Sequence, residues 1–209
     1  MENSGFKAGE GFSSTGYPLF QNTIMNLAII EYDIGKYDFR AWASSLLGVE
    51  PLENIHERAD LKTYSNVVAQ INACRSELSK GFSHCKPIYV DFIQSIIAPL
   101  YEGVNSYQIP PSFRFHFSGK GSSAFHRDRD YGVNPAYLNV WIPLTRVWGS
   151  NSIWIESEEG LGDFSPVELE YGQALIFDGP NLCHGSVLND TPSSRVSMDF
   201  RFSPCRVRV

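Results

Sequence analysis

The second half of the chain is a succession of short segments in which apolar and polar residues alternate. In residues 112–117 every second position is phenylalanine, and residues 137–144 and 194–202 follow the same two-residue period. This period places successive side chains on opposite faces of a β-strand. Further short apolar segments cover residues 153–156, 167–169 and 174–177. Because turn residues separate these segments, the pattern predicts a mainly antiparallel β fold, either a sandwich or a jelly roll.

The first half of the chain is predicted to be partly helical. Residues 61–78 carry apolar side chains at helical spacing, and residues 91–101 form a second, shorter helix candidate with Asp91 as its N-cap. Residues 23–32 are apolar enough for a buried helix or strand, and residues 1–22 are rich in glycine and serine and are expected to be irregular. We expect these helices to pack against one sheet.

The length and composition suit one packed domain. Of the 209 residues, 43% are hydrophobic and 13% are aromatic, which is enough to build a buried core. We expect a single domain over residues 1–209. Within it, residues 1–103 would be a helix-rich support region and residues 104–209 the jelly-roll core.

Charge and apolar patterning limit the partners. The formal net charge is −6 and no block of basic residues occurs, which argues against nucleic acid or a membrane as the main partner. The longest uncharged stretch, residues 11–30, is too polar to span a bilayer. The first five residues lack the features of a signal peptide, and the four cysteines show no CxxC spacing. We therefore expect a cytoplasmic protein.

A His-x-Asp pair, His126 and Asp128, is the first candidate for chemistry. In extended backbone these two side chains share a face, roughly 6.6 Å apart along the strand. Such a pair is common by chance, so a third ligand is needed. His184 is the preferred candidate and His116 the rival. Two imidazoles and one carboxylate form the facial triad typical of non-haem Fe(II) oxygenases.

A polar stripe downstream strengthens this interpretation. Arg195, Ser197, Asp199 and Arg201 alternate with apolar residues and so share one face of the predicted strand. A polar stripe is usually only the solvated face of a strand. In a barrel, however, that face would look into the cavity, and an arginine fork with a hydroxyl two residues on suits a carboxylate.

Together these residues resemble the Fe(II)/2-oxoglutarate-dependent oxygenases. The resemblance is closest to the phytanoyl-CoA dioxygenase-like branch and, within it, to small streptomycin-biosynthesis-type oxygenases. It rests on the triad, on the Arg-x-Ser pair, and on the runs at residues 137–145, 149–152, 172–177 and 184–185. It covers roughly residues 104–203.

The resemblance implies a double-stranded β-helix of the cupin superfamily. It implies that Fe(II) is held by His126, Asp128 and His184, and that 2-oxoglutarate chelates the iron and pairs its far carboxylate with Arg195 and Ser197. Asn139 is a further expected contact of 2-oxoglutarate. The implied reaction uses O2, releases succinate and CO2, and hydroxylates or otherwise oxidises a small molecule, either free or carrier-tethered. The carboxylate of Asp128 favours oxygen insertion over halogenation.

Several other side chains are weaker candidates. Arg201 would contact the cosubstrate or the ligand carboxylate, or else form an ion pair with Asp199. Arg114 and His116 could line the opening of the cavity, and strand parity suggests that Glu156 faces the site. Arg129, Asp130 and Tyr131 follow the His-x-Asp pair in a loop that could recognise the substrate.

Two other functions are compatible with the sequence. One is a cupin-like metal enzyme that does not use 2-oxoglutarate, such as an isomerase or a cosubstrate-free dioxygenase. The other is a non-catalytic module that binds a small ligand. The Arg-x-Ser pair argues against the first, and an intact triad argues against the second. The sequence leaves the substrate and the oligomeric state open.

Overall fold

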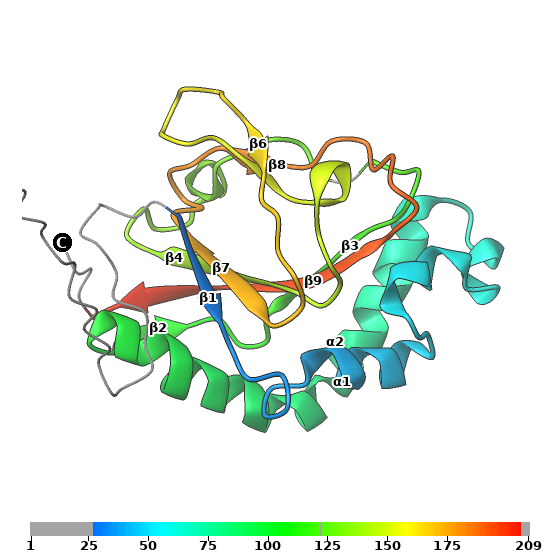
Figure 1. The fold of residues 1–209 in the computed structure, drawn as a ribbon, viewed down its shortest axis with the longest axis horizontal. Coiled ribbons are helices and arrows are strands. Elements are labelled where there is room, and N and C mark those ends of the chain that lie inside the picture. Colours follow the sequence, from blue (N-terminus) through cyan, green and yellow to red (C-terminus); the bar gives the residue numbers. More distant parts are fainter. Residues whose placement is uncertain (1–26, 122, 206–209) are drawn as a thin grey trace, which may run out of the picture.

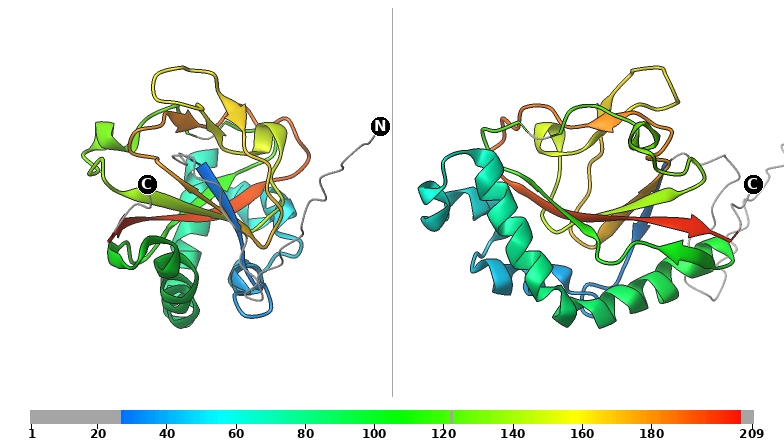
Figure 2. Two further views of the ribbon diagram at one scale, coloured as in Figure 1. Left: turned by 60° about the vertical axis from the view of Figure 1, so that its left-hand side comes forward. Right: turned by 180° about the vertical axis from the view of Figure 1, so that it is seen from behind.

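The computed structural model describes residues 27–121 and 123–205, so the expectation for residues 1–22 lies outside the described residues. In the described part, two antiparallel sheets lie one above the other, and helices cover the outer face of the larger sheet (Figures 1 and 2). This is a double-stranded β-helix, or cupin-like jelly roll, with flanking helices, and it confirms the predicted fold class.

The larger sheet is organised around its longest strand, β9. The order is β1-β7-β4-β9-β2, and β3 pairs with a separate part of β9. The strands are β1 (Leu27–Glu31), β2 (Val104–Tyr107), β3 (Ser112–His116), β4 (Leu138–Pro143), β7 (Gln173–Phe177) and β9 (Arg195–Pro204). Since β9 has ten residues, it pairs with β4 along one edge and with β3 and then β2 along the other.

The smaller sheet has three two-residue strands in the order β6-β5-β8. They are β5 (Trp154–Ile155), β6 (Ser165–Pro166) and β8 (His184–Gly185). The strand predicted over residues 167–169 is wrong. Pairing ends at Pro166, which has no N–H to donate to the ladder, and beyond it Leu169 forms an isolated bridge with Val147.

Two α-helices, α1 (Phe39–Leu47) and α2 (Val67–Phe92), pack beneath the larger sheet. Asp38 and Asn66 cap them, each accepting a hydrogen bond from the backbone N–H three residues on. The remaining helical turns are η1 (Leu52–Glu57), η2 (Asp60–Thr63), η3 (Ile93–Ile97), η4 (Ala98–Tyr101), η5 (Asp128–Tyr131) and η6 (Gly149–Asn151).

One continuous helix replaces the two that the pattern predicts. The helix expected over residues 61–78 begins later, after the Asn66 cap, and runs on to Phe92. The separate helix over residues 91–101 is wrong, because Asp91 lies inside α2 and not at an N-cap. Beyond Phe92 the helical backbone continues through η3 and η4.

Two residues inside α2 make its full length hard to predict from the sequence. A Cβ at Gly81 would fall only 2.3 Å from Cδ1 of Leu46, so the Leu46 side chain of α1 fills the space that a side chain at Gly81 would need. Pro87 also lies inside the helix and has no N–H for the helical ladder. Glycine and proline usually weaken helices, and here packing against the sheet outweighs that cost.

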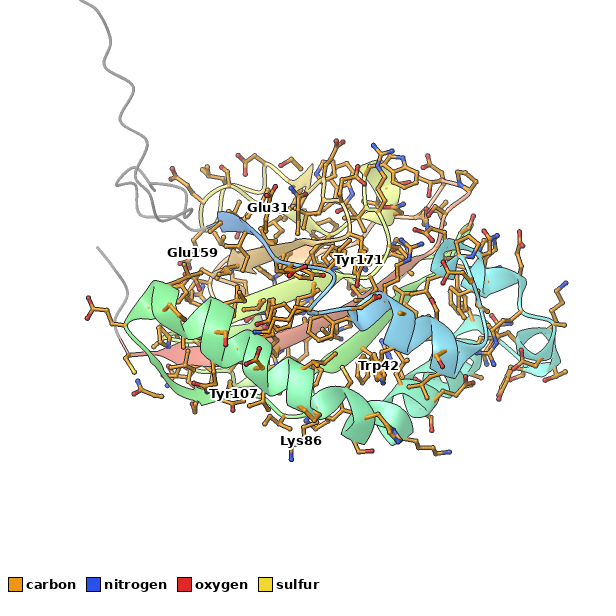
Figure 3. The ribbon with its side chains drawn as sticks, turned by 60° about the horizontal axis from the view of Figure 1, so that its bottom comes forward. Glu31, Trp42, Lys86, Tyr107, Glu159 and Tyr171 are labelled. Carbon is orange, nitrogen blue, oxygen red and sulfur yellow. The ribbon has the colours of Figure 1, made fainter. Side chains whose placement is uncertain are left out.

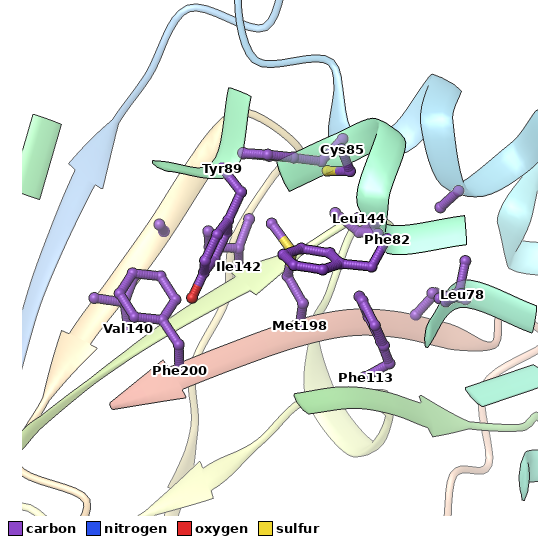
Figure 4. Packing of buried hydrophobic residues seen from close by; sticks show 14 of the residues in the cluster. Leu78, Phe82, Cys85, Tyr89, Phe113, Val140, Ile142, Leu144, Met198 and Phe200 are labelled. Atoms are coloured by element: carbon purple, nitrogen blue, oxygen red, sulfur yellow. The ribbon is translucent and has the colours of Figure 1, made fainter. Parts of the chain in front are cut away.

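The principal core fills the space between the helices and the outer face of the larger sheet (Figure 4). Val196, Met198, Phe200 and Phe202 of β9 are fully buried there. The ring of Tyr89 in α2 meets the ring of Phe200 edge-on, with centroids 5.3 Å apart. Burying each such side chain stabilises the fold by roughly 1.5–3 kcal/mol. The apolar face of β9 therefore packs outward, as the alternation predicts.

Loop side chains join the helices to the sheet edge (Figure 3). The Tyr171 hydroxyl donates to Oδ1 of Asp38 at 2.9 Å and accepts from the backbone N of Arg40 at 3.0 Å, at the start of α1. Trp42 lies between α1 and the sheet, whereas Lys86 points away from α2 into solvent. No helix in the described part of the chain has the length and apolar character needed to cross a membrane.

A smaller second core lies between the two sheets. Trp141 and Phe177 contribute from the larger sheet, and Ile155 and Leu182 from the smaller sheet and its neighbouring turn. This core covers part of the inner face of the larger sheet, and the polar side chains of β9 line the remainder.

Candidate active site

His126, Asp128 and His184 converge in the space between the sheets. Each can offer one ligand atom, and these atoms all lie within 4.8 Å of one another. The two histidines lie side by side because their backbones form a bridge, with N–H to O distances of 2.9 Å in both directions. A Cβ at Gly185 would be 2.8 Å from Cα of Phe125, so glycine at this position is what allows the two segments to meet.

Local hydrogen bonds orient both imidazoles. Nδ1 of His126 donates to the carbonyl of Ala124 at 2.9 Å, and Nδ1 of His184 donates to the carbonyl of Leu182 at 3.0 Å. A carbonyl can only accept, so each ring carries its proton on Nδ1 and leaves the Nε2 lone pair free for a metal. Burial lowers the pKa of His184, whereas the nearby Asp128 carboxylate raises the pKa of His126 despite partial burial.

The Asp128 carboxylate is buried and its two oxygens differ. Oδ2 accepts from Nδ2 of Asn139 and from Nε of Arg201, both at 2.8 Å. Oδ1 lies 3.6 Å from Nε2 of His126. Burial alone would raise the pKa of Asp128, but the nearby His126 ring and the hydrogen bonds from Arg201 and Asn139 hold it far below its usual range. Asp128 is therefore ionised, with one oxygen directed toward the histidines.

This donor set fits a divalent transition metal. Two imidazole nitrogens and one carboxylate oxygen lie close together, and all three residues line one cavity. The cavity is also lined by Arg114, Ser123, Asn139, Trp141, Ile153, Phe177, Gly185, Ser186, Arg195, Asp199 and Arg201.

Arg195 is a buried cation that lines this cavity. Its Nη1 donates to the carbonyl of Asn151 at 3.1 Å and its Nη2 to Oγ of Ser186 at 3.2 Å, while Nε has no partner among the described residues. It forms no salt bridge with any described carboxylate. Burial, together with the nearby Arg114, lowers the pKa of Arg195 to about 9. A buried guanidinium without an anion is costly, so the pocket is suited to receive one.

Trp141 connects Arg195 with Ser197. The guanidinium of Arg195 lies over the indole ring, 5.6 Å from its centroid, and the indole Nε1 donates to Oγ of Ser197 at 3.1 Å. Because Ser197 already accepts from Trp141, its hydroxyl proton is free to donate to an anion. Ser197 is fully buried and lies behind the residues that line the cavity.

Two inner-face residues take up contacts with acidic neighbours. Asn139, which is predicted to contact 2-oxoglutarate, donates to Asp128, and its Oδ1 is buried with no hydrogen-bond partner among the described residues. The alternative ion pair between Arg201 and Asp199 is wrong, because Arg201 bonds to Asp128 and Asp199 pairs with Arg114 at 2.7 Å.

Glu156 does not face the cavity. Its carboxylate accepts from the backbone N–H groups of Cys183, Gly160 and Gly162 and so fixes a loop beside β8. Strand parity fails here because β5 ends at Ile155. His116, the rival third ligand, is buried elsewhere on the inner face and donates from Nε2 to the carbonyl of Lys120.

The mouth of the site carries Tyr131. Its side chain is 77% exposed, and its ring lies edge-on to His126 with centroids 5.5 Å apart. Sequence reasoning missed Gly179, whose Cβ would fall 2.4 Å from Nδ2 of Asn139. It also missed the ring of Phe177, which packs against His184. No local sequence signal marks either contact, because both arise from the crossing of distant segments.

Comparison with known proteins gives one informative sequence relative. No protein-family profile matches the chain. The streptomycin biosynthesis protein StrG of Streptomyces griseus is 33% identical over 176 residues, which is 84% of this chain and 83% of StrG. Identity and coverage at this level establish common family membership.

Two solved structures are among those similar to the chain. EctD from S. alaskensis, with 2-oxoglutarate and 5-hydroxyectoine, is 16% identical, with a TM-score of 0.54 over 86% of this chain and 72% of EctD. HygX from Streptomyces hygroscopicus, with nickel, 2-oxoglutarate and hygromycin B, is 13% identical, with a TM-score of 0.41 over 57% of this chain and 66% of HygX. The likeness to EctD agrees with the jelly-roll architecture.

Proposed function

The chain belongs to the family of StrG, and on that premise we propose that it is an Fe(II)/2-oxoglutarate-dependent oxygenase of the phytanoyl-CoA dioxygenase-like branch. We expect it to oxidise a small-molecule substrate, with hydroxylation as the outcome. The observation that carries this proposal is the shared cavity. It holds three convergent metal-ligand atoms on one wall and a buried guanidinium that lacks an anion on another.

The proposed ligands of Fe(II) are Nε2 of His126, Oδ1 of Asp128 and Nε2 of His184. With 2-oxoglutarate and O2 bound, the iron would supply the oxidising chemistry, in which the keto acid would become succinate and CO2 and one oxygen atom would enter the substrate. The protein orients these groups through the backbone bridge between the histidines and the Nδ1 hydrogen bonds of both rings.

Arg195 and Ser197 are the proposed binding site for the far carboxylate of 2-oxoglutarate. The guanidinium would gain the anion that its burial calls for, and Ser197 would add a hydroxyl donor held in place by Trp141. The Phe177 ring against His184 shields the metal side of the cavity from water. The carboxylate of Asp128 supports oxygen insertion over halogenation.

The substrate would enter beside Tyr131 and Arg114. Both lie at or near the open side of the cavity, and the Arg114 side chain is partly exposed. A small polar molecule, either free or carrier-tethered, fits an opening with an aromatic ring and an ion pair.

Anaerobic reconstitution tests the function directly. Fe(II) and 2-oxoglutarate added to the protein should give the weak visible charge-transfer band of a chelated keto acid. His126→Ala and His184→Ala should abolish it, while His84→Ala, an exposed position on α2, should leave it unchanged. Folded wild-type protein without this band would refute the proposal.

A succinate-formation screen against a metabolite panel then seeks the substrate. Turnover that is indifferent to 2-oxoglutarate and survives Arg195→Ala would favour a cupin-like metal enzyme of another type.

A further inference from the structure

The surroundings of Asp128 point to a device that controls how this carboxylate binds a metal. Both hydrogen bonds from its charged and amide neighbours fall on one oxygen, Oδ2, where Arg201 Nε and Asn139 Nδ2 each approach to 2.8 Å. Among the described residues no side chain donates a hydrogen bond to Oδ1, which lies 3.6 Å from Nε2 of His126. The carboxylate is 3% exposed, so water does not compete strongly for either oxygen.

Three separate elements build this arrangement. Asn139 on β4 and Arg201 on β9 are direct cross-strand partners, so the sheet register places both donors on one patch of the inner face. The backbone N of Asp128 donates to the carbonyl of Gly179 at 3.1 Å, and the missing side chain at Gly179 leaves the space that Asn139 occupies. The asymmetry at Asp128 is thus fixed by the tertiary fold.

The difference between the two oxygens of Asp128 matters for metal coordination. A carboxylate can bind a metal through one oxygen or through both. In an octahedral site, two histidines and one carboxylate oxygen leave room for a chelating keto acid and one further ligand. A second oxygen from Asp128 would take one of those places.

We propose that Arg201 is a positioning residue that, with Asn139, engages Oδ2 of Asp128 and thereby restricts this carboxylate to one metal-facing oxygen. The inference rests on the proposed function of the same site. It assigns Arg201 a role through Asp128 and not through contact with the cosubstrate.

Simple electrostatics and the proposed positioning role predict opposite changes in metal affinity when Arg201 is replaced. Arg201 is a cation beside a site for a cation, so removing it should strengthen metal binding if charge alone matters. If Arg201 acts by orienting Asp128, removing it should weaken binding about tenfold, as loss of a partner of a metal ligand commonly does. The direction of the change therefore separates the two explanations.

The experiment is a Mn(II) titration of the metal-free full chain, followed by the EPR signal of free Mn(II). Arg201→Met should bind Mn(II) about tenfold more weakly than wild type. The matched control is Arg114→Met, which removes an equal charge from the same cavity wall but whose partner, Asp199, lies outside the cluster of metal-ligand atoms. This control should bind Mn(II) at least as tightly as wild type.

The visible absorption of the Co(II)-loaded protein gives a second readout, because it responds to coordination number. The spectrum of Arg201→Met should differ from that of wild type, and the spectrum of Arg114→Met should not. If Arg201→Met does not fold, Arg201→Lys replaces it. Lysine keeps the charge without the fixed guanidinium geometry, so its Mn(II) affinity should still be several-fold weaker than wild type.

Equal or tighter Mn(II) binding by the Arg201 variant, or an equal weakening in both variants, would overturn the inference. Failure of the proposed function looks different. In that case wild-type protein would not bind Mn(II), or His184→Ala would bind it as tightly as wild type.

Discussion

The two faces of the larger sheet use the same strands for opposite purposes. On the outer face, Val196, Met198 and Phe200 of β9 are fully buried against the helices. On the inner face, Arg195, Ser197, Asp199 and Arg201 point toward the cavity or the wall behind it. The outer face supplies apolar burial, which stabilises the fold, and the inner face gathers charges whose desolvation opposes folding.

The charges of the inner face are balanced in pairs, with one exception. Arg201 pairs with Asp128 and Arg114 pairs with Asp199, whereas Arg195 has no described anion. Alternate residues of a single strand therefore serve different ends, because those on one face stabilise the fold and those on the other face line the binding cavity. Mutations on the outer face should therefore lower the stability of the fold, and mutations on the inner face should lower ligand affinity.

The largest effect is expected on the outer face. Phe200→Ala removes a fully buried ring packed on Tyr89 and should lower the free energy of unfolding by about 4 kcal/mol. Urea denaturation measures this loss, and Mn(II) affinity of the folded fraction should persist. Phe164→Ala is the control, because this half-buried ring stacks on Phe125 in a loop and should cost about 1 kcal/mol. Equal losses for the two variants would contradict the assignment of the main core.

Arg195→Met should show the reverse signature. It removes the buried cation and should weaken 2-oxoglutarate binding roughly 100-fold, or about 3 kcal/mol, while Mn(II) binding stays intact. The melting temperature of the ligand-free protein should hold or rise, since methionine fills similar space without a desolvated charge. Isothermal titration and thermal melts measure the two quantities. A marked fall in stability with unchanged 2-oxoglutarate affinity would assign Arg195 to the structure alone.

The smallest effect concerns pH and the inner-face residue His116. Burial, reinforced by Arg195, lowers the pKa of His116 to about 4, so the unfolded chain binds its proton more readily than the folded protein does. Stability should therefore rise with pH from about 4 to about 6.5, and this group alone should cost about 1 kcal/mol between about pH 7 and pH 5.5.

His116→Gln should flatten this part of the stability profile while leaving metal affinity at neutral pH unchanged. Urea midpoints measured across that pH range provide the test. A wild-type profile that does not change on substitution would show that other groups control the acid limb.

Side-chain parity explains how much of this molecule could be predicted from its sequence. The period of residues 112–117, 137–144 and 194–202 gives three strands of the larger sheet and the correct face for each residue of β9. His126, Asp128, His184 and Arg195 come together in one cavity as expected, because His-x-Asp and Arg-x-Ser spacings carry their geometry within a single strand or loop.

Features that depend on crossings between distant segments were not predictable. α2 passes through Gly81 and Pro87, whose local propensities argue for an interruption. The hydrogen bond from Asn139 to Asp128 requires Gly179, which belongs to neither strand. Glu156 lies one residue beyond its strand, so its parity carries no information about its direction. In each case tertiary packing overrides the local pattern.

The pairing of β9 with three neighbours has a consequence for how this chain can change its length. A single residue inserted within β9 would turn arginines toward the helices and phenylalanines toward the cavity, so both stability and binding would fail together. The loop after Glu156, by contrast, is held at its base by the carboxylates of Glu156 and Asp163, and its outer residues are exposed. We therefore expect related chains to differ by insertions in that loop. In β9 we expect substitutions but no insertions or deletions.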